Sequence, residues 1–184
     1  MVNQELILVD EMDRPIGTMD KMEVHQKGLL HRAFSVFIFN SQGEMLLQQR
    51  ADEKYHSPGL WTNACCSHPG PGEEVADAAA RRLNEELGFE TPLRELFSFT
   101  YRAQFDNGLI EHEYDHVFVG MYDGKINADR SEVKNHEYLS LQQISNGLIE
   151  EPEQYTFWFH IAFPRIQDWA SEKSGAAVAQ PLFK

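Results

Sequence analysis

The stretch "EEVADAAARRLNEELGF", residues 73–89, carries the strongest structural signal in this chain. Val75, Ala79, Leu83 and Leu87 recur every four residues, which lines up one apolar stripe along a helix. Acidic residues fall in the first turn, and a glycine follows the last apolar position, as at a helix end. The sequence therefore predicts an amphipathic helix in the middle of the chain.

Most segments around this helix have the alternation and composition of strands. Residues 4–17 predict a strand, a turn and a returning strand, and residues 31–50 predict a hairpin with its turn at Asn40 to Gly43. Residues 92–105 and 110–122 predict further strands. Residues 57–72 are interrupted by Pro and Gly, which indicates a loop with a short strand.

The last third of the chain, residues 140–173, predicts helices interrupted at Gly147, Pro152 and Pro164. The order of predicted elements along the chain is strands, one helix, more strands and then helices. This order indicates a mixed α/β sandwich rather than a βαβ array. A length of 184 residues with 42% apolar content predicts a single domain over residues 1–184. The end "SGAAVAQPLFK", residues 174–184, has no functional signal and is predicted to be a tail.

The overall charge restricts the possible partners. Because the formal net charge is −13, we expect no nucleic-acid partner and no anionic membrane surface. The sequence predicts neither a signal peptide nor a membrane span. Two adjacent cysteines without a disulfide framework fit a reducing cytoplasm, so we expect a cytoplasmic protein, either a monomer or a weak homodimer.

Both cysteines lie in "WTNACCSHP", residues 61–69. Adjacent cysteines bridge only through a strained ring, and a zinc knuckle needs wider C-x2-C spacing. Three interpretations remain open from the residues alone: a reactive thiol, a metal site, or two small buried side chains.

The stretch "IEHEYD", residues 110–115, places two carboxylates on one face of a predicted strand. Glu111 and Glu113 point the same way and His112 points the other way, because side chains alternate along a strand. The pair indicates either a solvated face or a cation between the two groups. Three imidazoles elsewhere complete a candidate set of five ligands for Mn²⁺, Mg²⁺ or Zn²⁺: His25, His31, His68, Glu111 and Glu113.

Four basic residues from separate segments are candidates for an anion pocket, although each alone is ordinary surface charge: Lys21, Arg50, Lys54 and Arg82. Three aromatic residues are candidates for contact with a substrate or a cation, although most aromatic residues fill core: Trp61, Tyr101 and Trp158.

The segment "RRLNEELGF", residues 81–89, resembles the second half of the Nudix signature, R-E-U-x-E-E-x-G-U, in which U is aliphatic or aromatic. Glu73 stands at the acidic position eight residues before Arg81. Arg82 replaces a signature Glu, and Ser67 replaces the leading Gly. Because Nudix hydrolases bind their metals through that carboxylate cluster, the cation at Arg82 argues against pyrophosphate hydrolysis.

Four segments occur in one order: "GLLHRAFSVFIFN", "PGLWTNACCSHP", "RRLNEELGF" and "IEHEYDHVF". Together they resemble the type I isopentenyl diphosphate isomerases, metal-dependent members of the Nudix superfamily, from about Val9 to Trp158. The resemblance implies a Nudix-type α/β/α sandwich of mixed sheets with extra N- and C-terminal elements. It also implies reversible conversion of isopentenyl diphosphate to dimethylallyl diphosphate in isoprenoid biosynthesis.

The resemblance also implies a role for individual residues. Cys66 and Glu113 become the two acid–base residues, with Tyr101 beside Glu113. Glu86 becomes the ligand of a second ion, Mg²⁺, which accompanies the substrate diphosphate. The His/Glu set becomes a Mn²⁺ or Zn²⁺ site, formed by His25, His31, His68, Glu111 and Glu113. Diphosphate contacts fall on Lys21, Arg50, Lys54 and Arg82, and Trp158 covers the hydrocarbon end.

These implied roles suit the chemistry of the reaction. Protonating an unactivated alkene forms a tertiary cation, which requires an acid, a base and exclusion of bulk water. A thiol with an unperturbed pKa of about 8.5 exists in either state near neutrality. Because an extended strand alternates, Cys65 is expected to face away from Cys66 and only to pack.

Two alternatives belong to other functional classes. A Nudix hydrolase of a nucleoside diphosphate derivative predicts a complete set of signature glutamates, and leaves Cys66 and the Glu111–Glu113 pair without a role. A non-enzymatic module that senses a diphosphate needs no acid–base pair, so its function would survive a Cys66→Ala substitution.

Overall fold

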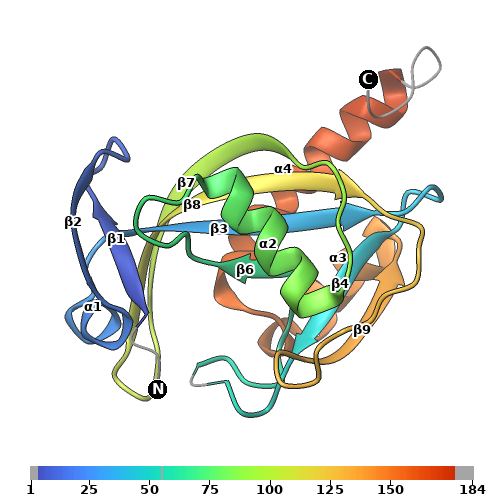
Figure 1. Ribbon diagram of the computed structural model, residues 1–184. Coiled ribbons are helices and arrows are strands. Elements are labelled where there is room, and N and C mark those ends of the chain that lie inside the picture. The colour runs from blue at the N-terminus through green and yellow to red at the C-terminus, as the bar shows by residue number, and fades with distance from the viewer. Residues whose placement is uncertain (1–3, 55, 177–184) are drawn as a thin grey trace.

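The computed structural model describes residues 4–54 and 56–176 (Figure 1). The strands are β1 (Glu5–Val9), β2 (Pro15–Asp20), β3 (His31–Phe39), β4 (Met45–Arg50), β5 (Trp61–Asn63), β6 (Cys65–Ser67), β7 (Arg94–Gln104), β8 (Ile110–Met121) and β9 (Val133–Leu139). The helices are α1 (Lys21–Lys27), α2 (Val75–Leu87), α3 (Leu141–Glu150) and α4 (Phe157–Ala176), with a 3-10 turn, η1 (Pro152–Gln154). Most of the predicted tail, residues 177–184, lies outside the described residues.

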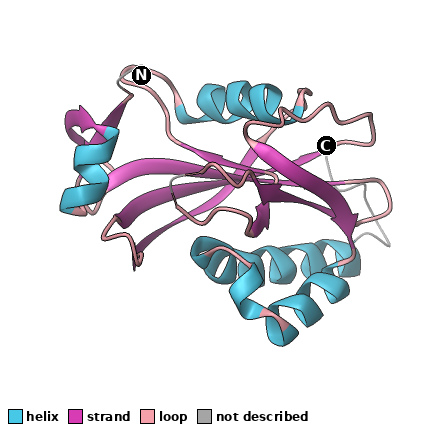
Figure 2. Cartoon of the chain, turned by 90° about the horizontal axis from the view of Figure 1, so that it is seen from below, coloured by secondary structure: helices cyan, strands magenta, loops and turns pink. Residues whose placement is uncertain are grey.

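The strands form a curled mixed sheet that is covered on both faces. Helix α2 lies on one face, and α3 and α4 lie on the other (Figure 2). Alternation along β3 produces this arrangement: Val36 and Ile38 pack with Leu83 of α2, whereas Phe37 packs with Phe163 of α4. The predicted α/β/α sandwich is therefore confirmed, with one core on each side of the sheet.

The predicted hairpin over residues 31–50 is correct only at its turn. Strands β3 and β4 pair at Phe39 and Met45 and then separate. Strand β3 continues in parallel with β8, and β4 continues between β5 and β9. Both strands are almost entirely buried, and the pairing of distant strands overrides the local hairpin preference.

Two elements were missed because their local signals are weak. Helix α1 has seven residues, too few for a periodic pattern. The Asp20 side chain accepts hydrogen bonds from the amides of Met22 and Glu23 at its start, and Gly28 closes it with φ of 62°. Strand β9 is largely polar, and it forms because it pairs with β4.

The predicted helix breaks were only partly correct. The helices do separate at Pro152, but Gly147 lies within α3 and Pro164 lies within α4. A Cβ at Gly147 would collide with the Tyr155 hydroxyl, so this glycine permits a close contact rather than ending the helix. Helix α4 tolerates Pro164 because Phe159, Phe163 and other side chains bury its apolar face.

Strand register brings the candidate site together. His31 of β3 lies beside Glu113 of β8, and Tyr101 of β7 lies opposite Glu113 on the other side. Cys66 of β6 pairs with Ser35 of β3. Paired positions point to the same face, so these side chains gather on the face of the sheet that α4 covers.

Candidate functional site

A cavity of about 350 Å³ opens at this end of the sheet. Its walls come from both terminal thirds of the chain as well as from the central helix. Every predicted diphosphate contact and acid–base residue lines it, together with several charged neighbours: Gln4, Lys21, Arg50, Lys54, His56, Cys66, Ser67, His68, Arg81, Arg82, Tyr101, Glu111, Glu113, Glu132 and Trp158.

Four of the five predicted ligands form one buried cluster. Their donor atoms lie within 4.8 Å of one another, in His25, His31, His68 and Glu113. His31 Nε2 and His68 Nδ1 are buried without a hydrogen-bond partner among the described residues. Backbone carbonyls hold the other nitrogens of two rings: Leu29 O contacts His31 Nδ1 at 2.9 Å, and Lys21 O contacts His25 Nδ1 at 2.6 Å. Three imidazoles and a carboxylate are suitable ligands for a divalent metal ion, so the cluster is compatible with such a site.

Glu113 is the centre of this cluster. His68 Nε2 lies 2.9 Å and His31 Nε2 lies 3.6 Å from its Oε1, and the Tyr101 hydroxyl lies 2.7 Å from its Oε2. Burial opposes ionisation of Glu113, but the two imidazoles outweigh it and hold the pKa of this carboxyl well below its ordinary value. Burial lowers the pKa of His68 to about 3, so its neutral, ligating form is favoured.

Glu111 lies outside the four-residue cluster but is linked to it. The Tyr101 hydroxyl contacts Glu111 Oε2 at 2.7 Å, as it does Glu113, and His56 Nε2 lies 2.9 Å from Glu111 Oε1. Burial and these two carboxylates raise the pKa of Tyr101 well above its ordinary value, so the phenol keeps its proton. Glu111 and Glu113 are 2% and 7% exposed, which excludes a solvated strand face.

Cys66 lines the cavity next to Trp158. Trp158 Nε1 donates to its sulfur at 3.0 Å, and the thiol donates to Asn63 Oδ1 at 3.0 Å. Burial, reinforced by Asp115, raises the pKa of Cys66 to about 12. The unperturbed value of about 8.5 therefore does not describe this thiol, because burial disfavours the thiolate. Cys65 packs on the α2 side of the sheet, which confirms the predicted opposite orientation.

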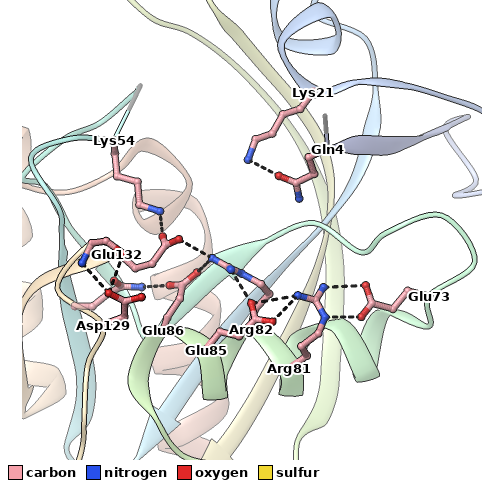
Figure 3. A network of polar contacts seen from close by, with 12 residues as sticks. Gln4, Lys21, Lys54, Glu73, Arg81, Arg82, Glu85, Glu86, Asp129 and Glu132 are labelled. Atoms are coloured by element: carbon pink, nitrogen blue, oxygen red, sulfur yellow. Dashed lines mark hydrogen bonds and ion pairs between the residues drawn. The ribbon is translucent and has the colours of Figure 1, made fainter. Parts of the chain in front are cut away.

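A polar network that includes several of the lining side chains is drawn in Figure 3. Arg82 Nη2 lies 2.6 Å from Glu86 Oε1 and 3.3 Å from Glu132 Oε1. Gln48 donates to Glu86 Oε2 at 3.1 Å, and Lys54 pairs with Glu132. Burial and the Lys54 ammonium lower the pKa of Lys21 to about 8. The predicted anion pocket therefore contains acidic as well as basic side chains.

Arg50 takes a different position from the other three predicted cations. Its guanidinium lies 5.4 Å from the centre of the Trp158 ring and donates to the carbonyls of His56 and Ser57. The side chain therefore places a cation against the tryptophan ring.

Arg81, the first arginine of the Nudix-like segment on α2, has a structural role. Arg81 donates from Nε to Glu73 Oε1 at 2.7 Å and from Nη2 to Glu73 Oε2 at 2.9 Å. This two-point contact ties α2 to the loop before it.

Comparison with known proteins identifies the family. The isopentenyl-diphosphate Delta-isomerase of Pectobacterium atrosepticum is 54% identical over 171 residues, covering 92% of this chain and 96% of that protein. The isopentenyl-diphosphate Delta-isomerase of Serratia proteamaculans is 52% identical over 158 residues, covering 86% of this chain and 88% of that protein. This chain belongs to the isopentenyl-diphosphate Delta-isomerase family.

The profile of the NUDIX domain matches residues 29–159, so this family member has a NUDIX domain. A crystal structure of DR0079 from Deinococcus radiodurans aligns with TM-score 0.73 and 19% identity, covering 88% of this chain and 98% of that chain. A crystal structure of a MutT protein from Methanosarcina mazei aligns with TM-score 0.61 and 20% identity, covering 76% of this chain and 94% of that chain. These two likenesses concern the fold. Within the described residues, none of the helices combines the length and apolar character that crossing a bilayer requires.

Proposed function

We propose that this chain interconverts isopentenyl diphosphate and dimethylallyl diphosphate by adding a proton to one carbon and removing one from another. One observation carries the proposal: Cys66 and the Glu113–Tyr101 pair line a single cavity, with Trp158 beside the thiol and four basic side chains in the same lining, Lys21, Arg50, Lys54 and Arg82. That combination matches an uncharged hydrocarbon joined to a diphosphate.

The proposed reaction conserves the diphosphate. A proton adds to C4 of isopentenyl diphosphate, which leaves a tertiary cation at C3, and loss of a proton from C2 forms dimethylallyl diphosphate. Cys66 and the Glu113–Tyr101 pair serve the two proton transfers. The Trp158 ring faces the cation and stabilises it by about 2 kcal/mol when water is excluded.

The His/Glu cluster is proposed to hold Mn²⁺ or Zn²⁺ through His25, His31, His68 and Glu113, with Glu111 as a fifth ligand. A bound divalent ion supplies positive charge that fixes the carboxylates and tunes their basicity. Glu86 is proposed as the protein ligand of Mg²⁺ that arrives with the diphosphate, because Mg²⁺ is commonly bound by one or two carboxylates together with substrate phosphates.

The diphosphate is proposed to contact Lys21, Arg50, Lys54 and Arg82. Holding the charged group away from the reacting carbons supplies binding energy that positions the alkene between its acid and base. We propose that one domain, as a monomer or weak homodimer, carries out this reaction in the cytoplasm, without a nucleic-acid or membrane partner.

The test uses purified protein, Mg²⁺ with Mn²⁺ or Zn²⁺, and isopentenyl diphosphate. We expect dimethylallyl diphosphate to form without release of phosphate, and Cys66→Ala to abolish the conversion. Cys65→Ala is the matched control, because this neighbouring sulfur faces α2 instead of the cavity. Phosphate release without isomerisation would favour a hydrolase. Binding of isopentenyl diphosphate without conversion, unchanged in Cys66→Ala, would favour a binding module; either result refutes the proposal.

A further inference from the structure

Glu132, which directly precedes β9, is an acidic side chain in the pocket proposed for an anion. It lines the same cavity as Lys21, Lys54 and Arg82. Its carboxylate pairs with Lys54 and lies 3.3 Å from Arg82 Nη2, with one-quarter of the side chain exposed (Figure 3). Two of the four cations proposed for the diphosphate therefore already contact an anion that belongs to the protein.

Backbone contacts fix Glu132 in this position. Its carbonyl accepts a hydrogen bond from the Ala51 amide at 3.0 Å, and its amide donates to the Asp129 carbonyl at 3.0 Å. The first contact joins Glu132 to the segment that carries Lys54. A carboxylate held between two cations in a ligand cavity differs from an ordinary surface ion pair, because ligand binding must displace it or include it.

Glu132 also lies close to the carboxylate proposed to bind Mg²⁺. Arg82 Nη2 contacts both Glu86 and Glu132, at 2.6 Å and 3.3 Å, so the two carboxylates share one nitrogen. Arg82 Nε is buried without a hydrogen-bond partner among the described residues. Arg82 thus contacts three carboxylates, those of Glu85, Glu86 and Glu132, and of these Glu132 is the one that lines the cavity.

We propose that Glu132 makes this pocket select a diphosphate carrying Mg²⁺ over the same diphosphate without metal. A bare diphosphate brings several negative charges and competes with the Glu132 carboxylate for Lys54 and Arg82. A Mg²⁺-bound diphosphate brings less negative charge, and its ion is attracted by Glu132 as well as by Glu86. The inference rests on the proposed diphosphate site, and it adds a residue that determines which form of the ligand binds.

The experiment measures binding of inorganic pyrophosphate by titration calorimetry, to protein freed of divalent ions, with and without added Mg²⁺. We compare wild type with Glu132→Gln and Glu132→Ala. The matched control is Glu85→Gln, because Glu85 Oε2 also contacts Arg82, at 2.8 Å from Nη1, but is not among the residues lining the cavity. Thermal unfolding verifies that each variant is folded.

For both Glu132 variants we expect affinity for metal-free pyrophosphate to rise about tenfold, which corresponds to about 1.4 kcal/mol. Affinity in Mg²⁺ stays the same or falls, so the preference for the Mg²⁺ form decreases at least tenfold, whereas Glu85→Gln retains it. An equal loss with and without Mg²⁺ would mean that Glu132 only holds Lys54 and Arg82 in place, and would overturn the inference.

The inference would also be overturned if the Glu132 variants kept the wild-type preference for the Mg²⁺ form, or if Glu85→Gln lost as much of that preference as they do. If wild type binds pyrophosphate in neither condition, the proposed diphosphate site itself fails. If wild type binds pyrophosphate but the ratio of its affinities with and without Mg²⁺ does not change as expected in the Glu132 variants, the diphosphate site is supported and the proposed role of Glu132 is refuted.

Discussion

Removing the hydroxyl of Tyr101 tests the arrangement of the carboxylates most sharply. This hydroxyl lies 2.7 Å from an oxygen of Glu111 and 2.7 Å from an oxygen of Glu113, and the side chain is 5% exposed. Tyr101→Phe keeps the ring, which lies 5.7 Å from Phe99, and deletes only the oxygen and its proton. The substitution therefore leaves two buried carboxylates without their common donor.

The size of the effect follows from the number of hydrogen bonds lost. A phenol has one proton, so it donates to one carboxylate at a time, and one charge-assisted hydrogen bond contributes about 1.5–3 kcal/mol. If the loss is felt mainly in the transition state, kcat for isomerisation falls by about 10- to 150-fold, since about 1.4 kcal/mol corresponds to a factor of ten. KM changes little, because the hydroxyl contacts Glu111 and Glu113, which are not proposed to bind the diphosphate.

The assay follows isopentenyl diphosphate at saturating concentration, with thermal unfolding as a check on folding. Tyr114→Phe is the matched control: this tyrosine lies next to Glu113 in β8, but its hydroxyl accepts a hydrogen bond from Ser98. We expect Tyr114→Phe to retain kcat within about twofold, a change of under 0.5 kcal/mol. Equal rates for wild type and Tyr101→Phe would refute the assignment of Tyr101 to the reacting carboxylate.

Three further predictions concern stability. Leu83→Ala deletes a fully buried side chain between α2 and the sheet, and should cost about 2–5 kcal/mol in urea unfolding. Chelation should lower the melting temperature of wild type, with Mn²⁺ or Zn²⁺ restoring it, whereas His68→Ala should show no such shift. Burial opposes ionisation of Glu132, but Lys54 and Arg82 outweigh it and lower its folded-state pKa. Wild type should therefore be more stable to unfolding than Glu132→Gln, and this difference should be complete above the unfolded-state pKa of about 4.3. It should disappear as the pH falls through the folded-state pKa of Glu132. A difference in the free energy of unfolding that grows on acidification would contradict this prediction.

The sequence predicted those parts of the fold that depend on local periodicity. The four-residue repeat of Val75 to Leu87 defined α2 because that helix buries one stripe. Alternation predicted that Cys65 and Cys66 face opposite sides, and that Glu111 and Glu113 share a side. The divergence of β3 from β4 could not be predicted in this way, because it depends on pairing with β8, about 80 residues away.

The sequence predicted the site residues that lie in recognisable motifs. It did not predict the residues whose role depends on a tertiary contact. His25, His31 and His68 were candidate ligands from the sequence, the family resemblance implied the same role, and the structure places them together. His56 and Glu132 are a single histidine and a single glutamate in polar loops, so nothing in their local sequence marks them. Each gains significance only from tertiary contact, His56 with Glu111 and Glu132 with Lys54.

The central claim is that Cys66 and Glu113 move protons at carbon, and deuterium incorporation tests it most directly. Isopentenyl diphosphate is incubated with the metal-loaded protein in deuterated water and followed by NMR. We predict dimethylallyl diphosphate with deuterium in a methyl group, and no product from Cys66→Ala or Glu113→Gln. Product formed without deuterium from the solvent, or formed at the wild-type rate by either variant, would contradict the account.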